Sequence, residues 1–194
     1  MDPARAEAAR AKAREYFRTR CTEAPAAAIR SGVRDACESL TSFLDGVAAE
    51  RVTRPHRAGQ WSVQEIVDHL VETYRPGVDE LRCLLAGQTP PGKPIPASLQ
   101  SKAPLLRPWP WLLRQLAGLQ ADVLALLDAA PDDLDTKVRA PLVMVVNVKD
   151  TDGGFTPLHW IEELDWKAYA MVSWRLHAID HLKQARATLA ALDG

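Results

Sequence analysis

The sequence is poor in cysteine. Its three cysteines, Cys21, Cys37 and Cys83, lie far apart among 194 residues and form no Cys-x-x-Cys pair. A small, odd number of scattered cysteines is typical of reduced thiols in a cytoplasmic protein and excludes a disulfide framework. It also excludes a thiolate zinc knuckle, so a metal ion would have to be bound by histidine and carboxylate groups.

The sequence also lacks long apolar runs and a surplus of either charge. No apolar run approaches the roughly 20 residues needed to cross a bilayer, and the segment 1–20 alternates alanine with charged residues, unlike a secretory signal. The net charge of −1 argues against a protein that binds nucleic acid mainly through phosphate contacts. We therefore expect a cytoplasmic protein with no membrane and no nucleic-acid partner. A Gly-rich phosphate loop, a Gly-x-Ser-x-Gly elbow and a His-Glu-x-x-His motif are absent as well.

What the sequence does contain is a series of helical patterns. Asp2 and Pro3 are typical of a helix start and predict a helix to about residue 19. Its apolar face is thin, so we interpret residues 1–21 as an arm on the outside of a domain formed by 22–194. Ser62 and Glu65 form a capping box, and Pro76 predicts a kink in the helix that follows. Apolar residues recur at steps of three and four in four further segments, 26–49, 62–84, 111–129 and 165–192.

The connections between these helices are long. Residues 51–60 are predicted to be a loop, and seven of the fourteen prolines fall between Pro90 and Pro110, which predicts an extended linker. Residues 137–155 contain a short β-branched run that fits either a small strand or an ordered apolar loop, and 157–163 would be a short turn before the last helix. Such linkers allow crossover connections between helices.

Three of the five histidines have a spacing that suits a metal ion. His177 and His181 lie at i and i+4 on one predicted helix and therefore share a face. His69 lies at the edge of the apolar face of another helix, so two facing helices could direct three imidazoles to one point. Three neutral imidazoles suit a divalent metal such as Zn or Ni and leave a position for water or substrate. The alternative is that these are buried histidines whose rings bond to carbonyl or carboxylate groups.

The surroundings of the histidines resemble a known family. The Trp61-Ser62 helix start with His69-Leu70 one to two turns later, together with the late His177-x-x-x-His181 and Gln184, is similar to the DinB/YfiT-like superfamily over about residues 26–192. The resemblance implies an all-α four-helix bundle, here with an extra N-terminal helix and long crossover linkers. By position it implies that His69, His177 and His181 bind one divalent metal. It also implies a homodimer, for which the Trp109-Pro110-Trp111 segment offers aromatic surface.

The resemblance further implies an activity. Proteins of this kind include metal-dependent transferases that use a low-molecular-weight thiol, so we expect a metal-activated thiol or water to attack a small electrophilic substrate. Metal-dependent hydrolysis is not distinguished from thiol transfer by the sequence. A different alternative is a non-catalytic, stress-related bundle that binds a ligand and has a structural metal or none.

A few further residues are candidates for substrate contact. Trp174 and Tyr74 could line the pocket or belong to the core, and Gln184 could touch the substrate or close the site. His159 could approach the pocket from the segment before the last helix. Glu65 could accept a bond from a metal ligand, but its capping role is the better explanation of this residue. Asp68 and Asp180 are expected to face solvent, and His56 is expected on the surface.

Overall fold

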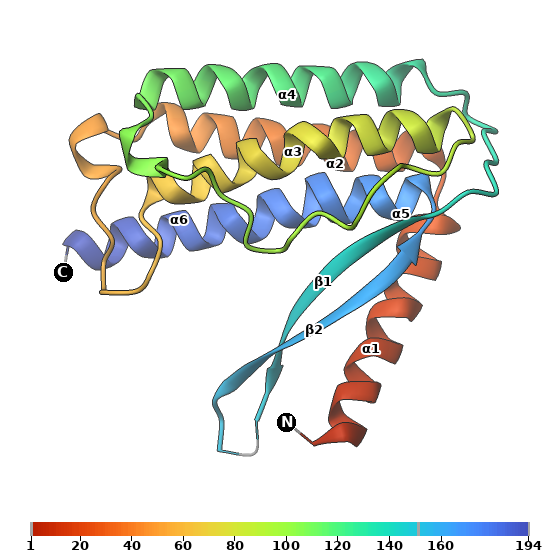
Figure 1. Cartoon of the computed structure of the whole chain (residues 1–194), viewed down its shortest axis with the longest axis horizontal. Coiled ribbons are helices and arrows are strands. Elements are labelled where there is room, and N and C mark those ends of the chain that lie inside the picture. Colours follow the sequence, from red (N-terminus) through yellow and green to blue (C-terminus); the bar gives the residue numbers. More distant parts are fainter. Residues whose placement is uncertain (1, 151, 194) are drawn as a thin grey trace.

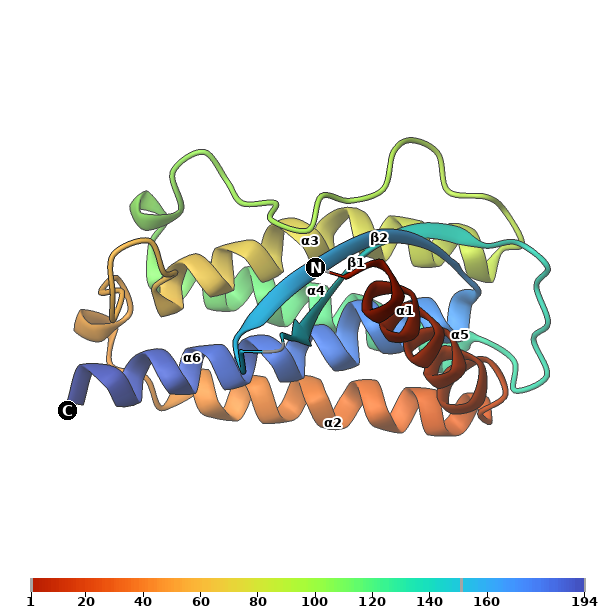
Figure 2. The same cartoon turned by 90° about the horizontal axis from the view of Figure 1, so that it is seen from below.

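The computed structural model describes residues 2–150 and 152–193. Long helices lie side by side along the longest axis of the molecule (Figures 1 and 2). We call these helices the helical body: α2 (Ala26–Asp45), α3 (Val63–Leu85), α4 (Trp109–Ala129), and the last helical stretch from α5 (Trp166–Ala170) to α6 (His177–Asp193). The apolar stripes predicted from the sequence meet inside this body, where they form the hydrophobic core.

The predicted capping box at the start of α3 is confirmed. Ser62 accepts a hydrogen bond from the Glu65 backbone, and Glu65 accepts one from the Ser62 backbone N–H at 2.8 Å. These two bonds satisfy backbone groups that the first turn leaves unpaired. The helix continues through Pro76 to Leu85 without interruption. His69 therefore lies in the second turn of one continuous helix.

The last helical stretch changes its winding in the middle. Between α5 and α6, residues Met171–Leu176 form a π-helical segment, η4. Asp165 caps the start of α5 by accepting bonds from the backbone N–H groups of Lys167 and Ala168. His177 is the first residue of α6, directly after the π-helical segment. Such segments are uncommon in helices and occur often at functional sites.

The all-α prediction is wrong in one part of the chain. Strands β1 (Ala140–Lys149) and β2 (Phe155–Leu164) form an antiparallel hairpin. The β-branched run in β1 is therefore a strand, and the segment 157–163, predicted to be a turn, is part of the second strand. Pro157 is tolerated because both strands are edge strands, where an N–H can be missing from the ladder.

Two further segments lie against the helical body. After α3, residues 86–103 run along the body as an extended crossover and lead through a short turn, η3 (Pro104–Leu106), into α4 (Figure 1). At the N-terminus, α1 (Pro3–Phe17) and a π-helical turn, η1 (Arg18–Thr22), precede α2. Helix α1 lies beside the hairpin, where Arg14 forms an ion pair with Glu162 at 2.9 Å. No helix in the described residues is long and apolar enough to span a membrane.

Candidate metal centre

Three histidines from two helices converge inside the helical body. His69 comes from α3, while His177 and His181 occupy successive turns of α6. Each offers a ring nitrogen, and the three nitrogens lie within 4.8 Å of one another. The Nε2 atoms of His69 and His177 are 2.9 Å apart. The structure thus brings together the three histidines that the sequence pattern singled out.

Hydrogen bonds to the outer ring nitrogens determine which nitrogens face inward as acceptors. The Nδ1 atom of His69 lies 2.7 Å from the carbonyl oxygen of Leu99, and a carbonyl can only accept. That nitrogen must therefore carry the proton, which leaves Nε2 with a lone pair. His181 Nδ1 lies 2.8 Å from the side-chain oxygen of Gln184.

The result is an arrangement that can bind a cation. The Nε2 lone pair of His69 points at Nε2 of His177 across 2.9 Å, so it can accept either the ring proton of His177 or a cation. Nitrogens bound to one tetrahedral Zn²⁺ are about 3.3 Å apart, which follows from bond lengths of about 2.0 Å. The observed spacing therefore needs only a small adjustment to hold a divalent ion.

Burial keeps all three rings neutral. Desolvation lowers the pKa of His181 to about 4 and the pKa of His177 well below its usual value. It also lowers the pKa of His69, against an opposing effect of the Leu99 carbonyl. Neighbouring imidazoles lower the pKa of His177 and His181 further, because a charge on one ring disfavours a charge on the next. Neutral imidazole is the form that binds metals.

Comparison with known proteins places this chain in a family. A family model described as the DinB superfamily matches residues 33–165. The chain belongs to the DinB superfamily. The matched part of this DinB chain includes His69 but ends before His177 and His181, so the pairing of all three histidines rests on the structure.

A solved structure has the same fold as this DinB chain. An uncharacterised protein from Escherichia coli UTI89 aligns with a TM-score of 0.58 at 11% sequence identity, over 87% of this chain and 95% of that one. At this identity the similarity concerns the fold alone. A search of the curated proteins finds no match.

Trp61 covers the outer side of the histidine cluster. Its ring stacks on His181 with centroids 6.2 Å apart and an interplanar angle of 20°, and it lies 5.0 Å from the ring of His69. The Trp61-Ser62 helix start that supported the DinB resemblance therefore has a physical role in this protein. The sequence motif includes Trp61 but does not indicate that its ring lies against the histidines.

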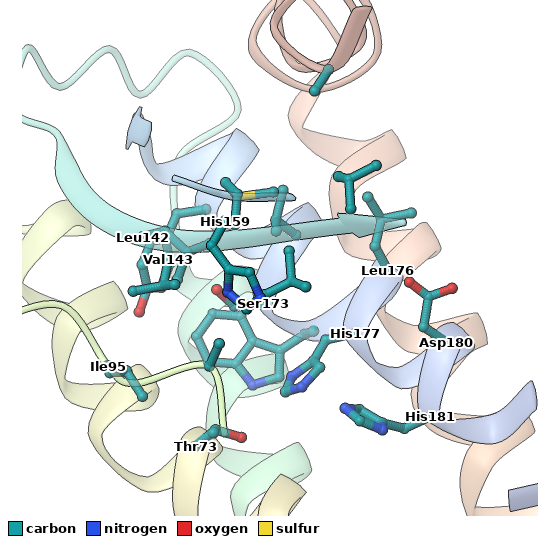
Figure 3. A pocket seen from close by; sticks show the side chains of 18 of the residues that line it. Thr73, Ile95, Leu142, Val143, His159, Ser173, Leu176, His177, Asp180 and His181 are labelled. Atoms are coloured by element: carbon teal, nitrogen blue, oxygen red, sulfur yellow. The ribbon is translucent and has the colours of Figure 1, made fainter. Parts of the chain in front are cut away.

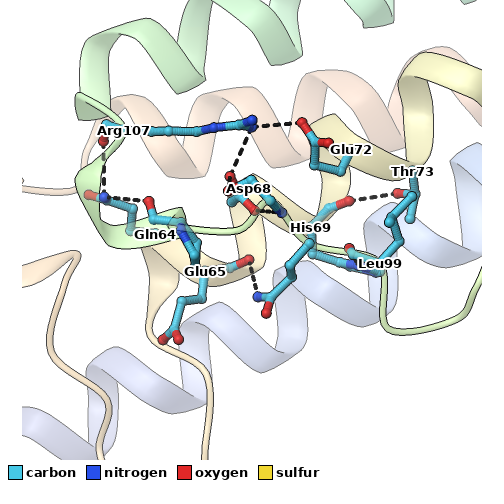
Figure 4. Close-up of polar contacts among 11 residues, drawn as sticks. Gln64, Glu65, Asp68, His69, Glu72, Thr73, Leu99 and Arg107 are labelled. Atoms are coloured by element: carbon cyan, nitrogen blue, oxygen red, sulfur yellow. Dashed lines mark hydrogen bonds and ion pairs between the residues drawn. The ribbon is translucent and has the colours of Figure 1, made fainter.

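A polar network, which we call the Asp68 clamp, holds the crossover against α3 (Figure 4). The Asp68 carboxylate accepts bonds from the backbone N–H and the hydroxyl of Ser101, both at 2.8 Å, and pairs with Arg107 at 3.0 Å. Arg107 also pairs with Glu72 at 2.7 Å. Because Ser101 is two residues after Leu99, the clamp holds in place the carbonyl that orients His69.

Asp68 and Glu65, two acidic residues of α3, have different surroundings. Asp68 was expected to face solvent, but it is fully buried because the crossover lies over it. The expectation for Asp68 is therefore wrong, whereas Asp180 is exposed as predicted. Glu65 serves as the helix cap and is not bonded to a histidine; the oxygen that bonds His69 comes from Leu99 instead. The path of a proline-rich linker does not follow from a helical pattern, so no sequence motif indicates this contact.

A large cavity opens beside the histidine cluster. It has a volume of about 1120 Å³ and lies between the helical body, the crossover, the hairpin and α1. Figure 3 shows His159 pointing from the hairpin into this cavity, toward the side where Ser173 and His177 lie. Tyr74 and Trp174 also border it, but both are almost completely buried. Gln184 does not line the cavity and bonds to His181.

The cysteines of the DinB chain are poor candidates for nucleophiles. Burial raises the pKa of Cys21 to about 11 and that of Cys37 to about 12. Both thiols are therefore protonated near neutral pH, and the thiolate is the reactive form. Cys83 lies outside the residues that line the cavity.

Proposed function

We propose that this DinB protein is a metal-dependent enzyme in which His69, His177 and His181 bind one divalent ion, Zn or Ni. The observation that carries the proposal is the convergence of three ring nitrogens from two helices within 4.8 Å, with the Nε2 lone pair of His69 directed inward because its Nδ1–H donates to the Leu99 carbonyl. A divalent ion can use all three inward nitrogens at once, whereas one hydrogen bond within the cluster uses only two of them.

The donor set is typical of a catalytic metal site. Three protein ligands leave at least one coordination position for water or substrate. When bound, the metal would lower the pKa of a coordinated water or thiol and polarise an electrophile. The reaction class that fits is attack of a thiol or water on a small electrophilic substrate.

The remaining roles belong to residues around the cluster. Leu99 and Gln184 hold the rings of His69 and His181 in position, which is how outer hydrogen bonds tune metal ligands. We propose that His159, on the opposite wall, contacts the substrate, with Tyr74 and Trp174 forming the back of the site. Since burial raises the pKa of Cys21 and Cys37, a thiol nucleophile would come from a separate low-molecular-weight thiol.

The arrangement of the helical body supports assigning it to the four-helix bundle of the superfamily, with residues 1–21 as an added arm. We further propose that the protein acts as a homodimer. These assignments do not alter the chemistry of the site, because all three proposed ligands come from one chain.

Metal analysis tests the ligand assignment. We expect the purified wild type to hold close to one equivalent of divalent metal, and His69→Ala and His181→Ala to lose most of it, because two imidazoles bind a divalent ion weakly. His56→Ala is the matched control, since His56 is exposed in a loop away from the cluster and should leave the metal content unchanged. Equal metal content in all four proteins would contradict the proposal.

Activity of the metal-loaded protein tests the reaction class. Turnover of an aryl halide that requires added thiol would support thiol transfer. Turnover of an ester without thiol would support hydrolysis. If the metal-loaded wild type accelerates neither reaction, the result favours a non-catalytic bundle that binds a ligand.

A further inference from the structure

The cavity beside the histidines has walls that are largely apolar. The crossover contributes Ile95, Pro96 and Ala97, and the last helical stretch contributes Val172 and Leu176. The hairpin adds the apolar run 142–146, and α1 adds small and aromatic side chains. Apolar walls of this extent recognise a ligand mainly because binding removes the apolar surface of the ligand from water.

Charged groups are almost absent from these walls. Among the described residues that line the cavity, Lys12 and Asp180 are the only ones with a full charge, and both are exposed at its margin. Within the part of the chain that the structure describes, no arginine lines the cavity, and arginine is the residue that recognises carboxylate and phosphate through paired hydrogen bonds. An anionic substrate would lose its hydration here without gaining a charged partner from the chain.

One wall of the cavity is exposed apolar surface. Val145 on β1 borders the cavity and is 43% exposed, and its cross-strand partner is His159. Residues directly opposite in an antiparallel pair project from the same face of the sheet. Since His159 points into the cavity (Figure 3), the side chain of Val145 belongs to the same face of the hairpin. A ligand in the cavity would cover this face.

We infer that the cavity binds a substrate with a neutral, predominantly apolar body, whose reactive group lies at the histidine cluster. The volume of about 1120 Å³ is enough for a molecule of drug size, since sites for such ligands commonly occupy about 300–1,000 Å³. This inference rests on the proposed function for the position of the reactive group. The choice of a neutral body over a charged one rests on the cavity walls alone.

The test uses a neutral apolar dye and a pair of competitors. Metal-free protein is titrated with Nile red, and the bound dye is then displaced with decanamide or with decanoate at pH 7.5. We expect saturable one-to-one dye binding, and we expect decanamide to displace the dye at a concentration about tenfold lower than decanoate, because a carboxylate must be desolvated without a partner. Equal potency of the two competitors would overturn the inference.

A matched pair of variants locates the binding site. Val145→Asp places a short charged side chain on the cavity wall, whereas Leu105→Asp makes the same kind of change at a residue of nearly equal exposure, 45%, outside the cavity. Both positions are partly exposed, so both variants should fold. We expect Val145→Asp to weaken dye binding about tenfold or more and Leu105→Asp to leave it unchanged.

The outcomes separate this inference from the proposed function. Dye binding that Val145→Asp does not weaken would overturn the assignment to this cavity, even if the histidines bind metal. Absence of dye binding, together with a change of oligomeric state in Val145→Asp, would show that a second copy covers the face and would also overturn it. If the histidine variants hold as much metal as the wild type, the proposed metal site is wrong. A positive dye result would still support binding of apolar ligands in the cavity.

Discussion

At the scale of single residues, the histidine cluster combines low basicity with fixed orientation. His177 and His181 lie where burial and neighbouring imidazoles oppose a positive charge. In the unfolded chain the same residues would titrate near pH 6.5. Folding therefore makes these rings available to a metal at pH values where free histidine would be protonated.

This difference predicts how stability depends on pH in the metal-free protein. Between pH 6.5 and about 4 the unfolded chain binds a proton at His181 that the folded chain does not. Stability is thus fully present above pH 6.5 and falls as the pH is lowered through this window, by up to about 1.4 kcal/mol per pH unit for each such histidine. Urea unfolding of wild type and His181→Gln at several pH values checks this. An equal slope in both proteins would contradict it.

Tyr74 permits a test of whether its buried hydroxyl lacks a hydrogen-bond partner. Its hydroxyl is buried and makes no hydrogen bond to the described residues. A buried polar group without a partner costs about 1–3 kcal/mol, so Tyr74→Phe should leave the free energy of unfolding unchanged or raise it. Thermal unfolding of the metal-free variant measures this. A decrease of more than about 1 kcal/mol would mean that the hydroxyl has a partner in solution, such as an ordered water.

The site could be predicted from the sequence where a short spacing determines it. The pair His177 and His181 shares a face in any α-helix, and the capping box fixes where the helix of His69 begins. The group that bonds to the outer nitrogen of His69 could not be predicted in the same way. The Leu99 carbonyl is a backbone atom of a linker, and its position depends on tertiary contacts that no periodicity records.

At the scale of elements, the crossover after α3 is a structural part of the metal centre. The Asp68 clamp holds Ser101, and through it the Leu99 carbonyl, against the helix that contains His69. We expect Asp68→Ala to weaken Zn²⁺ binding by about 10- to 100-fold, the effect common for residues that support metal ligands. The His69 Nδ1 proton resonance of the metal-free variant, observed by NMR, should also shift or disappear.

Glu72→Ala is the control for this prediction. Glu72 also pairs with Arg107 but makes no bond to Ser101. Both variants remove one carboxylate partner of Arg107, but only Asp68→Ala also removes the hydrogen bonds to Ser101. If the two variants have equal metal affinity and equal His69 resonances, Asp68 supports the fold in general and does not position His69.

The hairpin marks the limit of prediction at this scale. Its β-branched first strand was open to two interpretations, because a short apolar run fits a strand or an ordered loop equally well. The second strand, β2, contains Pro157 and two adjacent glutamates, Glu162 and Glu163, and was therefore not predicted to be a strand. Pairing with β1 and the contact of Glu162 with α1 provide the stability that the local sequence does not indicate.

At the scale of the whole molecule, the expected homodimer would need a surface other than the Trp109-Pro110-Trp111 segment. Trp109 belongs to the core, and Trp111 lies under the Arg107 guanidinium at 5.2 Å. The neighbouring Leu106 is 84% exposed instead. We expect light scattering at micromolar concentration to give the mass of a dimer. A monomer under these conditions would refute the prediction.

The π-helical segment η4 determines how α6 is rotated about the helix axis relative to α5. It lies between α5, which adjoins the hairpin, and α6, which presents His177 and His181. Each residue in an α-helix advances the direction of its side chain by about 100°. A π-helical turn holds about one residue more than an α-helical turn. If the six residues of η4 wound as a regular α-helix, α6 would therefore rotate relative to α5 by roughly the 100° of one residue, and either the two histidines would turn away from His69 or α5 would leave its place in the core. Deleting one residue, such as Val172, lets the segment wind as an α-helix and keeps this phase, so we expect metal analysis to show that the deletion retains more metal than insertion of one alanine after Val172. In this sense η4 acts as an angular spacer, and the chain tolerates its irregular winding because the alignment of the two helix ends depends on it.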